Sequence, residues 1–302
     1  MKRVKNSIKF ATGIRRLDAM VDNHILNYFN EREKEFLLRL GNLKTSPEAE
    51  DIHQLRVEVK KIRSVLQLLD HIPGNTFEHK AFRKMLRQLF RPAGRVREEQ
   101  INLNLAEGLE GFSLSGYRGY LQMRIDKQSG KLMRALNRFD ENSFREFNSA
   151  IKTEIGLFDE KTLRDYAGRF MQKQLSLVRR TGKEMQQKNQ IHETRKHLKA
   201  LRYILNIALE WDHNEETGRF YILVKDTETL IGNWHDLEML NRSLKKFGTK
   251  PDGYNDQDEI NRVTAKLENE QSDLLALIQK NLDSMPEKIK GFQGNSEISN
   301  TY

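Results

Sequence analysis

The stretch from Ile52 to Leu69 constrains the fold most, because it carries two stripes of different chemistry at helical spacing. At about 100° per residue, one side of a helix receives only apolar residues, namely Ile52, Leu55, Val59, Ile62, Leu66 and Leu69. A basic group lies about 110° round the surface and consists of His53, Arg56, Lys60 and Arg63. The stretch therefore predicts an amphipathic helix with a line of positive charge beside its buried face.

The same pattern returns between Ile191 and Ala208. The matching basic positions are His192, Arg195, Lys199 and Arg202, and the apolar positions match too, except that Thr194 replaces Leu55. A duplicated fold must keep its core, but packing does not require the H-x-x-R-x-x-x-K-x-x-R face to recur. The repeat indicates a retained task, and it predicts an internal duplication with one helical bundle in residues 1–150, a second in 151–290 and a polar tail in 291–302.

A second, shorter motif repeats in step with the first. About 40 residues after each motif histidine comes a glycine followed by a charged pair. Gly94 precedes Arg97 and Glu98, and Gly232 precedes His235 and Asp236. Glu98 and Asp236 are expected to orient neighbouring arginines or to cap a helix.

Composition favours an all-α protein, since the 302 residues include only 5 prolines and few alternating β-branched runs. Breaks are expected at residues 72–75, at Pro92, in the glycine-rich stretch 108–119 and near 212–216. The helices expected between them are 14–40, 45–71, 76–90, a short one after Pro92, 117–137, 162–187, the repeated basic helix, 217–231 with a further segment from Gly232, and 256–281.

Several classes of protein are excluded on simple grounds. The chain has no cysteine, so disulfides and thiolate chemistry are absent. There is no signal-peptide pattern, no apolar run near the ~20 residues of a membrane span, and no G-x-x-x-x-G-K-[ST] phosphate loop. His192-Glu193 is followed by His197, one residue too far for H-E-x-x-H, so we expect neither metal nor cofactor. A soluble cytoplasmic protein is the expectation.

The net charge of +9 points to a polyanion as partner. The paired H-x-x-R-x-x-x-K-x-x-R helices, each followed by G-x-x-[RH]-[DE], resemble the CHAD domain family over nearly the whole chain. The resemblance implies two four-helix bundles related by a pseudo-two-fold axis, with basic helices lining a central pore or groove. It also implies non-enzymatic binding of inorganic polyphosphate, and makes polyphosphate granules a candidate location. The E-x-E-x-K signature of the triphosphate-tunnel domain found in many members is not present.

The resemblance assigns polyphosphate binding to both basic helices and to the shorter motif. The residues are His53, Arg56, Lys60, Lys61, Arg63, Arg97, His192, Arg195, Lys196, Lys199, Arg202 and His235. Lys61 is matched by Ala200, so the halves need not contribute equally. Further candidates are Arg83, Arg87, Arg91 and Arg134, of which the first three follow one side of the helix after the break.

Two other functions stay open at this stage. Nucleic acid would suit the same charge, although Tyr203 beside Arg202 is almost the only aromatic residue on the basic faces. A metal-dependent phosphohydrolase acting on a polyanion would need a metal-holding carboxylate cluster, for which only Glu98 and Asp236 are available.

Overall fold

A computed structural model describes residues 23–73, 77–185, 187–211, 214–250 and 257–289. Within these residues all regular structure is helical, which confirms the all-α prediction. The helices are α1 (His24–Thr45), α2 (Ala49–Leu69), α3 (Lys80–Glu107), α4 (Ser115–Asn137), α5 (Glu141–Ile155), α6 (Glu160–Gly182), α7 (Lys188–Trp211), α8 (Glu215–Gly248) and α9 (Gln257–Asp283).

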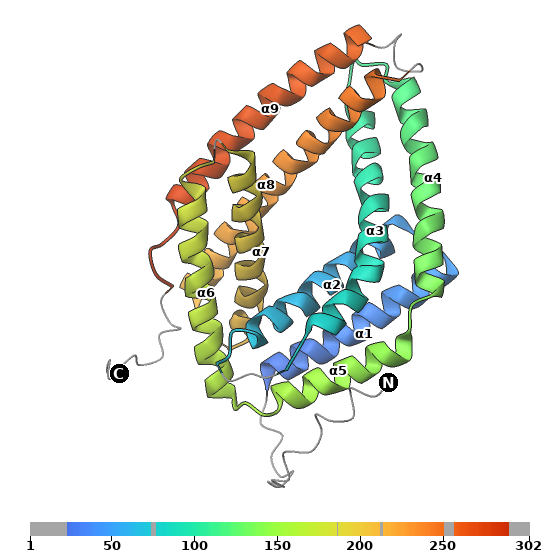
Figure 1. The fold of residues 1–302 in the computed structure, drawn as a ribbon. Helices are drawn as coiled ribbons and strands as arrows, with labels where there is room; N and C mark the ends of the chain where they lie inside the picture. Colours follow the sequence, from blue (N-terminus) through green and yellow to red (C-terminus); the bar gives the residue numbers. More distant parts are fainter. Residues whose placement is uncertain (1–22, 74–76, 186, 212–213, 251–256, 290–302) are drawn as a thin grey trace.

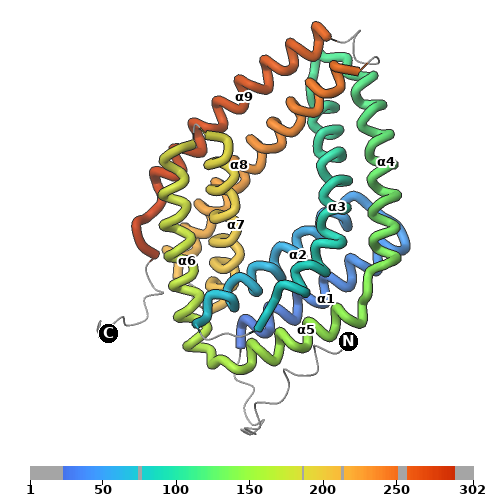
Figure 2. Tube along the Cα trace, in the orientation of Figure 1, coloured from blue at the N-terminus to red at the C-terminus, as the bar shows by residue number. Residues whose placement is uncertain are grey.

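The helices pack as pairs of chain neighbours arranged around a ring (Figure 1). The pairs are α1 with α2, α3 with α4, α6 with α7, and α8 with α9. In each pair one helix lies on the inner side of the ring, and these inner helices are α2, α3, α7 and α8 (Figure 2). Helix α5 runs along the outside of α1 and connects the first four helices to the last four.

Two apolar clusters hold the ring together. The larger one runs through both parts of the chain, from Ile25 to Ile289, and includes Phe36 stacked on Phe144 at 4.4 Å between ring centroids. The smaller one joins α3 and α4 to α8 and α9, where Tyr117 contacts Phe247 at 5.4 Å. The expected boundary between residues 150 and 151 lies inside α5.

The prediction that Pro92 ends a helix is wrong. Helix α3 continues through it to Glu107, so the segment after Pro92 is not a separate short helix. Proline removes one intrahelical hydrogen bond, but the buried side of α3 continues across it through Leu89, Ala93 and Val96. Continuous burial on both sides of Pro92 outweighs the loss of that bond.

The expected end of a helix at Ile231 is also wrong, because α8 continues through Gly232 as one helix of 34 residues. A glycine inside a helix costs only about 1 kcal/mol relative to alanine, and the buried residues of α8 continue on both sides of it. The loop expected over 108–119 is shorter, since α4 begins at Ser115, and α5 was not predicted at all.

The remaining expected helix bounds agree with the structure to within a few residues, apart from two segments that lie wholly or partly outside the described residues. Residues 14–22 of the first expected helix and the tail 291–302 fall outside the described residues, while the described part of that helix continues to Thr45. None of the helices in the described part of the chain combines the length and apolar character that a membrane span requires.

Candidate functional site

Helix α2 presents the first basic motif as the sequence predicts. Its apolar stripe is fully buried, with Ile52, Leu55, Val59 and Ile62 each at most 1% exposed. The motif side chains lie beside that stripe and are half-buried rather than free in solvent, and they are His53, Arg56, Lys60 and Arg63. Helix α7 repeats the arrangement with His192, Arg195, Lys199 and Arg202, all half-buried as well.

Lysines from the two motif helices lie close enough to repel one another. Burial, the charge of Lys199 and the charge of Arg56 together lower the pKa of Lys60 to about 7. Burial and the charge of Arg195 lower the pKa of Lys199 to about 8. The packing of α2 against α7 accounts for this approach. The structure therefore brings basic side chains of two distant segments together where α2 packs against α7, and both helices lie on the inner side of the ring (Figure 2).

Arg56 is fixed in place by the helix next to it. Its Nη1 donates a hydrogen bond to the carbonyl oxygen of Phe90 at 2.8 Å, and its guanidinium lies 4.3 Å from the centroid of the Phe90 ring. Burial and the charge of Arg97 lower the pKa of Arg56 to about 10. Gly94, one turn further along α3, leaves the space that the guanidinium fills.

The corresponding arginine of α7 is placed in a similar way. A Cβ on Gly232 would lie 3.5 Å from Nη2 of Arg195, so this glycine also lies beneath a motif arginine. Sequence reasoning identified both glycines but not that each lies beside a motif arginine, and only at Gly94 would a Cβ displace the guanidinium. The Nε atoms of Arg97 and Arg195 are buried without a hydrogen-bond partner.

Glu228 is a site residue that the sequence analysis missed. It is buried on α8, with an oxygen 2.9 Å from Nη1 of Arg202 and another 3.6 Å from Nζ of Lys199. In the first half, the matching position one turn before the glycine is Phe90, whose ring lies 5.5 Å from the Arg63 guanidinium. The available signal was the helical spacing of Glu228 to Gly232, which places both on one face.

The shorter motif reaches the same region. Burial lowers the pKa of His53 and of Arg56, and the charge of Arg97 lowers both further. Burial lowers the pKa of His235 to about 4, and the charges of Arg195, His192 and Lys199 add to that effect. Burial raises the pKa of Asp236, although cations from both halves oppose it. Arg97, His235 and Asp236 therefore lie among the motif residues. Glu98 is exposed on α3, but its charge also acts on Arg56 and opposes the lowering of the Arg56 pKa.

The other candidates lie at the edge of this cluster or away from it. Lys61 pairs with buried Glu58 at 2.7 Å, and exposed Lys196 pairs with Glu193 at 2.6 Å. The charges of Arg83 and Arg87 act on Arg63, and Arg83 also pairs with Asp70. Arg91 is exposed on α3, and Arg134 is exposed on α4, the outer partner of α3.

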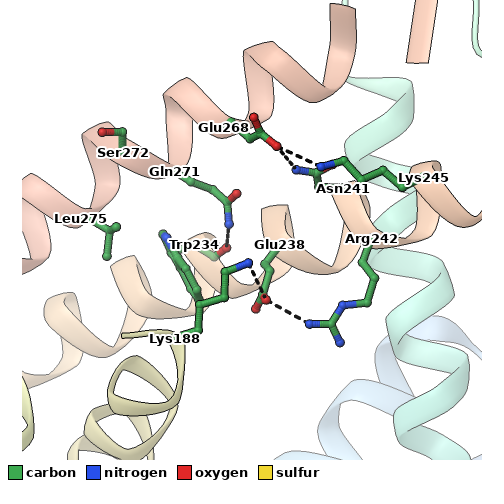
Figure 3. A pocket seen from close by; sticks show the side chains of 10 residues that line it. All are labelled: Lys188, Trp234, Glu238, Asn241, Arg242, Lys245, Glu268, Gln271, Ser272 and Leu275. Carbon is green, nitrogen blue, oxygen red and sulfur yellow. Dashed lines mark hydrogen bonds and ion pairs between the residues drawn. The ribbon is translucent and has the colours of Figure 1, made fainter. Parts of the chain in front are cut away.

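Two adjoining pockets open on α7 and α8. One, of about 490 Å³, is lined by Asn189, His192, Glu193, Arg195, Lys196, Lys199 and His235. The other, of about 510 Å³, lies between α7, α8 and α9 and is shown in Figure 3. There the Glu238 carboxylate forms ion pairs with Arg242 at 3.0 Å and with Lys188 at 3.4 Å.

The histidines of the second half have a partner that sequence reasoning did not find. The expectation that His192 lacks further metal ligands rested on its own helix, but His235 and Glu238 of α8 bring one nitrogen and one oxygen to within 4.8 Å. This is the one group of three such residues among those that the structure describes.

A family model and a solved structure both match this chain to the same domain. A family model described as the CHAD domain matches residues 31–245. The crystal structure of the CHAD domain from the plant Ricinus communis matches with a TM-score of 0.67 at 18% identity, covering 87% of this chain and 92% of that one. No curated protein matches the sequence. At this identity the structural likeness concerns the fold alone.

Proposed function

Because the chain belongs to the CHAD domain family, we propose that it binds inorganic polyphosphate without catalysis, with the basic faces of α2 and α7 lining a central pore or groove. The observation that carries the proposal is the packing of α2 against α7, which brings half-buried cations of both motifs together, so that the charge of Lys199 acts on Lys60. Lysines held together in this way repel one another, and a bound polyanion would relieve that repulsion. A cytoplasmic location, including polyphosphate granules, belongs to the same proposal.

The geometry of the two motif arginines supports the interpretation that the halves are copies. Arg56 lies against Gly94 and Arg195 lies beside Gly232, so a motif arginine adjoins the repeated glycine in each half, more closely in the first. Regularly spaced arginines on a rigid support suit successive phosphates, since a guanidinium binds phosphate oxygens in pairs. Buried Nε groups on Arg97 and Arg195 without partners add donors that an anion would satisfy.

Nucleic acid is the weaker proposal, because the aromatic residue that could have stacked a base is covered. Tyr203 is only 6% exposed, and the Arg202 guanidinium lies 4.9 Å from its ring centroid. The Phe90 ring is similarly covered by Arg56. Binding of single-stranded nucleic acid usually relies on exposed aromatic side chains, so charge alone would have to hold it here.

A phosphohydrolase function has less support. Glu98 lies exposed on α3 and Asp236 half-buried on α8, with cations rather than other carboxylates acting most strongly on Asp236. Incubation with polyphosphate and Mg²⁺ tests this alternative directly. Release of inorganic phosphate by the purified protein would establish catalysis, and its absence is the expected result.

A competition titration tests the choice of polyanion. Labelled RNA is bound to the full chain at near-physiological salt, and unlabelled long polyphosphate is added at matched phosphate concentration. We expect polyphosphate to displace the RNA, because its charges are more densely spaced than those of a strand with intervening sugars. If RNA or DNA instead binds at least tenfold more tightly than polyphosphate, the protein is a nucleic-acid-binding protein. Both affinities should fall as salt rises, since counterion release contributes to each.

Charge reversal locates the site. The variant carrying R56E, K60E, R195E and K199E should lose polyphosphate binding while its circular dichroism spectrum stays helical. The control variant is R262E with K280E, which reverses exposed cations on the outer helix α9. If the control loses as much polyphosphate affinity, the loss reflects net charge and not a site. If the fourfold variant binds polyphosphate as tightly as the native chain, the site does not lie on α2 and α7.

A further inference from the structure

Helix α3 carries a row of exposed cations on the side that faces away from the core. The buried residues Phe82, Leu86 and Leu89 point the other way, about 180° round the helix. The row ends at Glu98, one turn beyond its last member. Its members recur at spacings of three, four and four residues, fall within about 80° of one another, and are Lys84, Arg87, Arg91 and Arg95.

Helix α4 carries a second row of the same kind. Its members recur at spacings of four, three and four residues, fall within about 60° of one another, and are Lys127, Lys131, Arg134 and Arg138. Three of them are exposed and Lys131 is half-buried, while Arg138 directly follows the end of the helix. At 1.5 Å rise per residue, each row is about 16 Å long.

The contact between Arg124 and Glu99 sets how the two rows lie relative to one another. Nε of Arg124 donates a hydrogen bond to Oε1 of Glu99 at 2.7 Å, and α3 and α4 run antiparallel side by side (Figure 1). Counting back along α3 and forward along α4 from this pair brings Arg95 beside Lys127, and the later members of both rows follow in step. Because both helices turn their apolar side to the core, the two rows border one solvent-facing groove.

These row cations have no counter-charge in the part of the chain that the structure describes. None of them forms an ion pair there, because the carboxylates nearest to the hairpin pair with Arg83 and Arg124 instead. Four like charges from each helix over such a short length repel one another. They produce a strong positive potential along the groove, which attracts an elongated polyanion.

This surface differs from the basic cluster of α2 and α7. Phe90 and Gly94 form the side of α3 that contacts Arg56, and that side lies about 90° round the helix from the row. The two surfaces adjoin at Arg87, whose charge acts on Arg63. The motif cations are half-buried, whereas nearly all the row cations are exposed, so the groove offers mobile charges rather than a rigid cradle.

We propose that the groove between α3 and α4 binds the phosphate backbones of double-stranded nucleic acid without reading the base sequence. Packed helices lie roughly 8 to 10 Å apart, so the two rows run side by side at about that distance. A duplex carries phosphates every 3.4 Å or so along each strand, and its minor groove is about 6 Å wide. Two rows of long, flexible cations therefore reach both backbones over about five base pairs.

The composition of the groove favours a duplex over two other polyanions. Single strands are usually held by stacking on exposed aromatic side chains. Within residues 84–95 and 127–138 the one aromatic residue is Phe90, whose ring is covered by Arg56. Membrane surfaces hold a helix through inserted apolar side chains. On α3 and α4 the one large apolar side chain that is exposed is Met123, at 62%.

Fluorescence anisotropy with a short labelled DNA duplex of mixed sequence tests the groove on the full chain. R95E with K127E should weaken binding at least tenfold at low salt. Its plot of log affinity against log salt should be shallower by about 2, since each phosphate contact contributes about 0.9 to the slope. The matched control is R262E with K280E, which reverses two exposed cations of α9 and reaches the same net charge. The control should keep the native slope and lose less than threefold in affinity.

Lysine acetylation followed by mass spectrometry locates the contact without any substitution. Bound duplex should protect Lys127 and leave exposed Lys280 as reactive as in the free chain. Equal acetylation of Lys127 with and without duplex would overturn the proposal, and so would an equal loss of affinity in the control variant. If circular dichroism shows that the reversed variant is unfolded, R95Q with K127Q takes its place.

Vesicles of phosphatidylserine and phosphatidylcholine form the last arm of the experiment. The native chain should bind the duplex more tightly than these vesicles at the same salt. Co-sedimentation with vesicles that R95E with K127E abolishes, in a chain that does not bind the duplex, would assign the groove to a membrane surface instead. Polyphosphate is absent throughout, so these outcomes are independent of the function proposed for α2 and α7.

Discussion

The Arg56 guanidinium lies so close to Gly94 that a Cβ at that position would be 3.2 Å from Cζ and nearer still to Nη1. The displaced group would be the end of a flexible side chain, not backbone. Gly94→Ala should therefore leave the fold intact, and could add up to about 1 kcal/mol of helix stability. Arg56 would lose its position over Phe90, so we expect polyphosphate affinity to fall several-fold by titration.

Gly232→Ala is the matched control for that variant. Its Cβ would lie 3.5 Å from Arg195, which is an ordinary van der Waals contact. The same gain in helix propensity should appear in the unfolding free energy, with polyphosphate affinity unchanged. An equal loss of affinity in both variants would show that the glycines act through α3 and α8 themselves rather than through the arginine above Gly94.

Binding of long polyphosphate should take up protons. With pKa values of about 7 and about 8, Lys60 and Lys199 are together short of about one proton at pH 7.5 in the free protein. A polyanion restores both charges, so affinity should fall as pH rises from 7 to 9. The groups that face Lys60 across this region are Arg56 on α2, Lys199 and Arg195 on α7, and Glu228 and Asp236 on α8.

Calorimetry in buffers of different ionisation enthalpy measures that uptake. In Lys60→Arg the guanidinium stays charged over the whole range, so the uptake at pH 7.5 should fall clearly below that of the native chain. Lys280→Arg, on the exposed side of α9, should leave the native value. Binding without proton uptake in the native chain would contradict the placement of these lysines at the site.

Glu228→Gln should change stability and affinity in opposite directions. The carboxylate neutralises Arg202 at 2.9 Å, so its loss leaves half-buried cations without a counter-charge and should lower the unfolding free energy by about 1 to 3 kcal/mol. Polyphosphate would then meet one more positive charge, and at pH 6.5 its affinity should rise. Glu210→Gln removes an exposed carboxylate from α7 and should do neither.

His79 should make stability depend on pH. Burial alone lowers the pKa of this ring, but hydrogen bonds to Glu154 at 2.8 Å and Asp70 at 2.6 Å outweigh it, so the pKa is raised overall. Asp70 also forms an ion pair with Arg83. A raised pKa gives stabilisation that is complete below the unfolded value of about 6.5 and is lost as pH rises through the folded value.

His79→Leu tests that dependence in chemical denaturation. The substitution places an apolar group beside the buried carboxylate of Glu154. It should lower the free energy of unfolding by about 3 to 5 kcal/mol at pH 6. The fall in stability above pH 6.5 should be smaller in the variant than in the native chain. His24→Gln is the control, since its pair with Glu160 is partly exposed and should contribute at most about 1 kcal/mol.

Sequence periodicity was sufficient for most of the helices, though not for α5, and for the motif faces. The buried stripe of α2 and the half-buried basic side chains follow directly from residues spaced three and four apart. Local rules failed at Pro92 and Gly232, which are helix breakers in isolation but lie inside α3 and α8. Packing on both sides of each residue decides the outcome there, and packing depends on helices distant in the sequence.

The neighbours of the motif residues could not be predicted in the same way. Nothing local to Glu228 indicates that it pairs with Arg202, because that pairing depends on how α7 packs against α8. The same is true of His192 and Glu238, which lie on different helices. Contacts within one helix follow from spacing, whereas contacts between helices require the crossing geometry.

Crowded lysines also bear on how long the protein survives in a cell. If polyanion binds as proposed, the chain without it is the less stable form, because the repulsion between Lys60 and Lys199 is then not relieved by an anion. Bound ligand adds to folding stability in proportion to the logarithm of its concentration, and proteases remove the unfolded fraction. The half-life of the protein would then lengthen as polyanion accumulates, so that turnover as well as occupancy follows the supply of ligand.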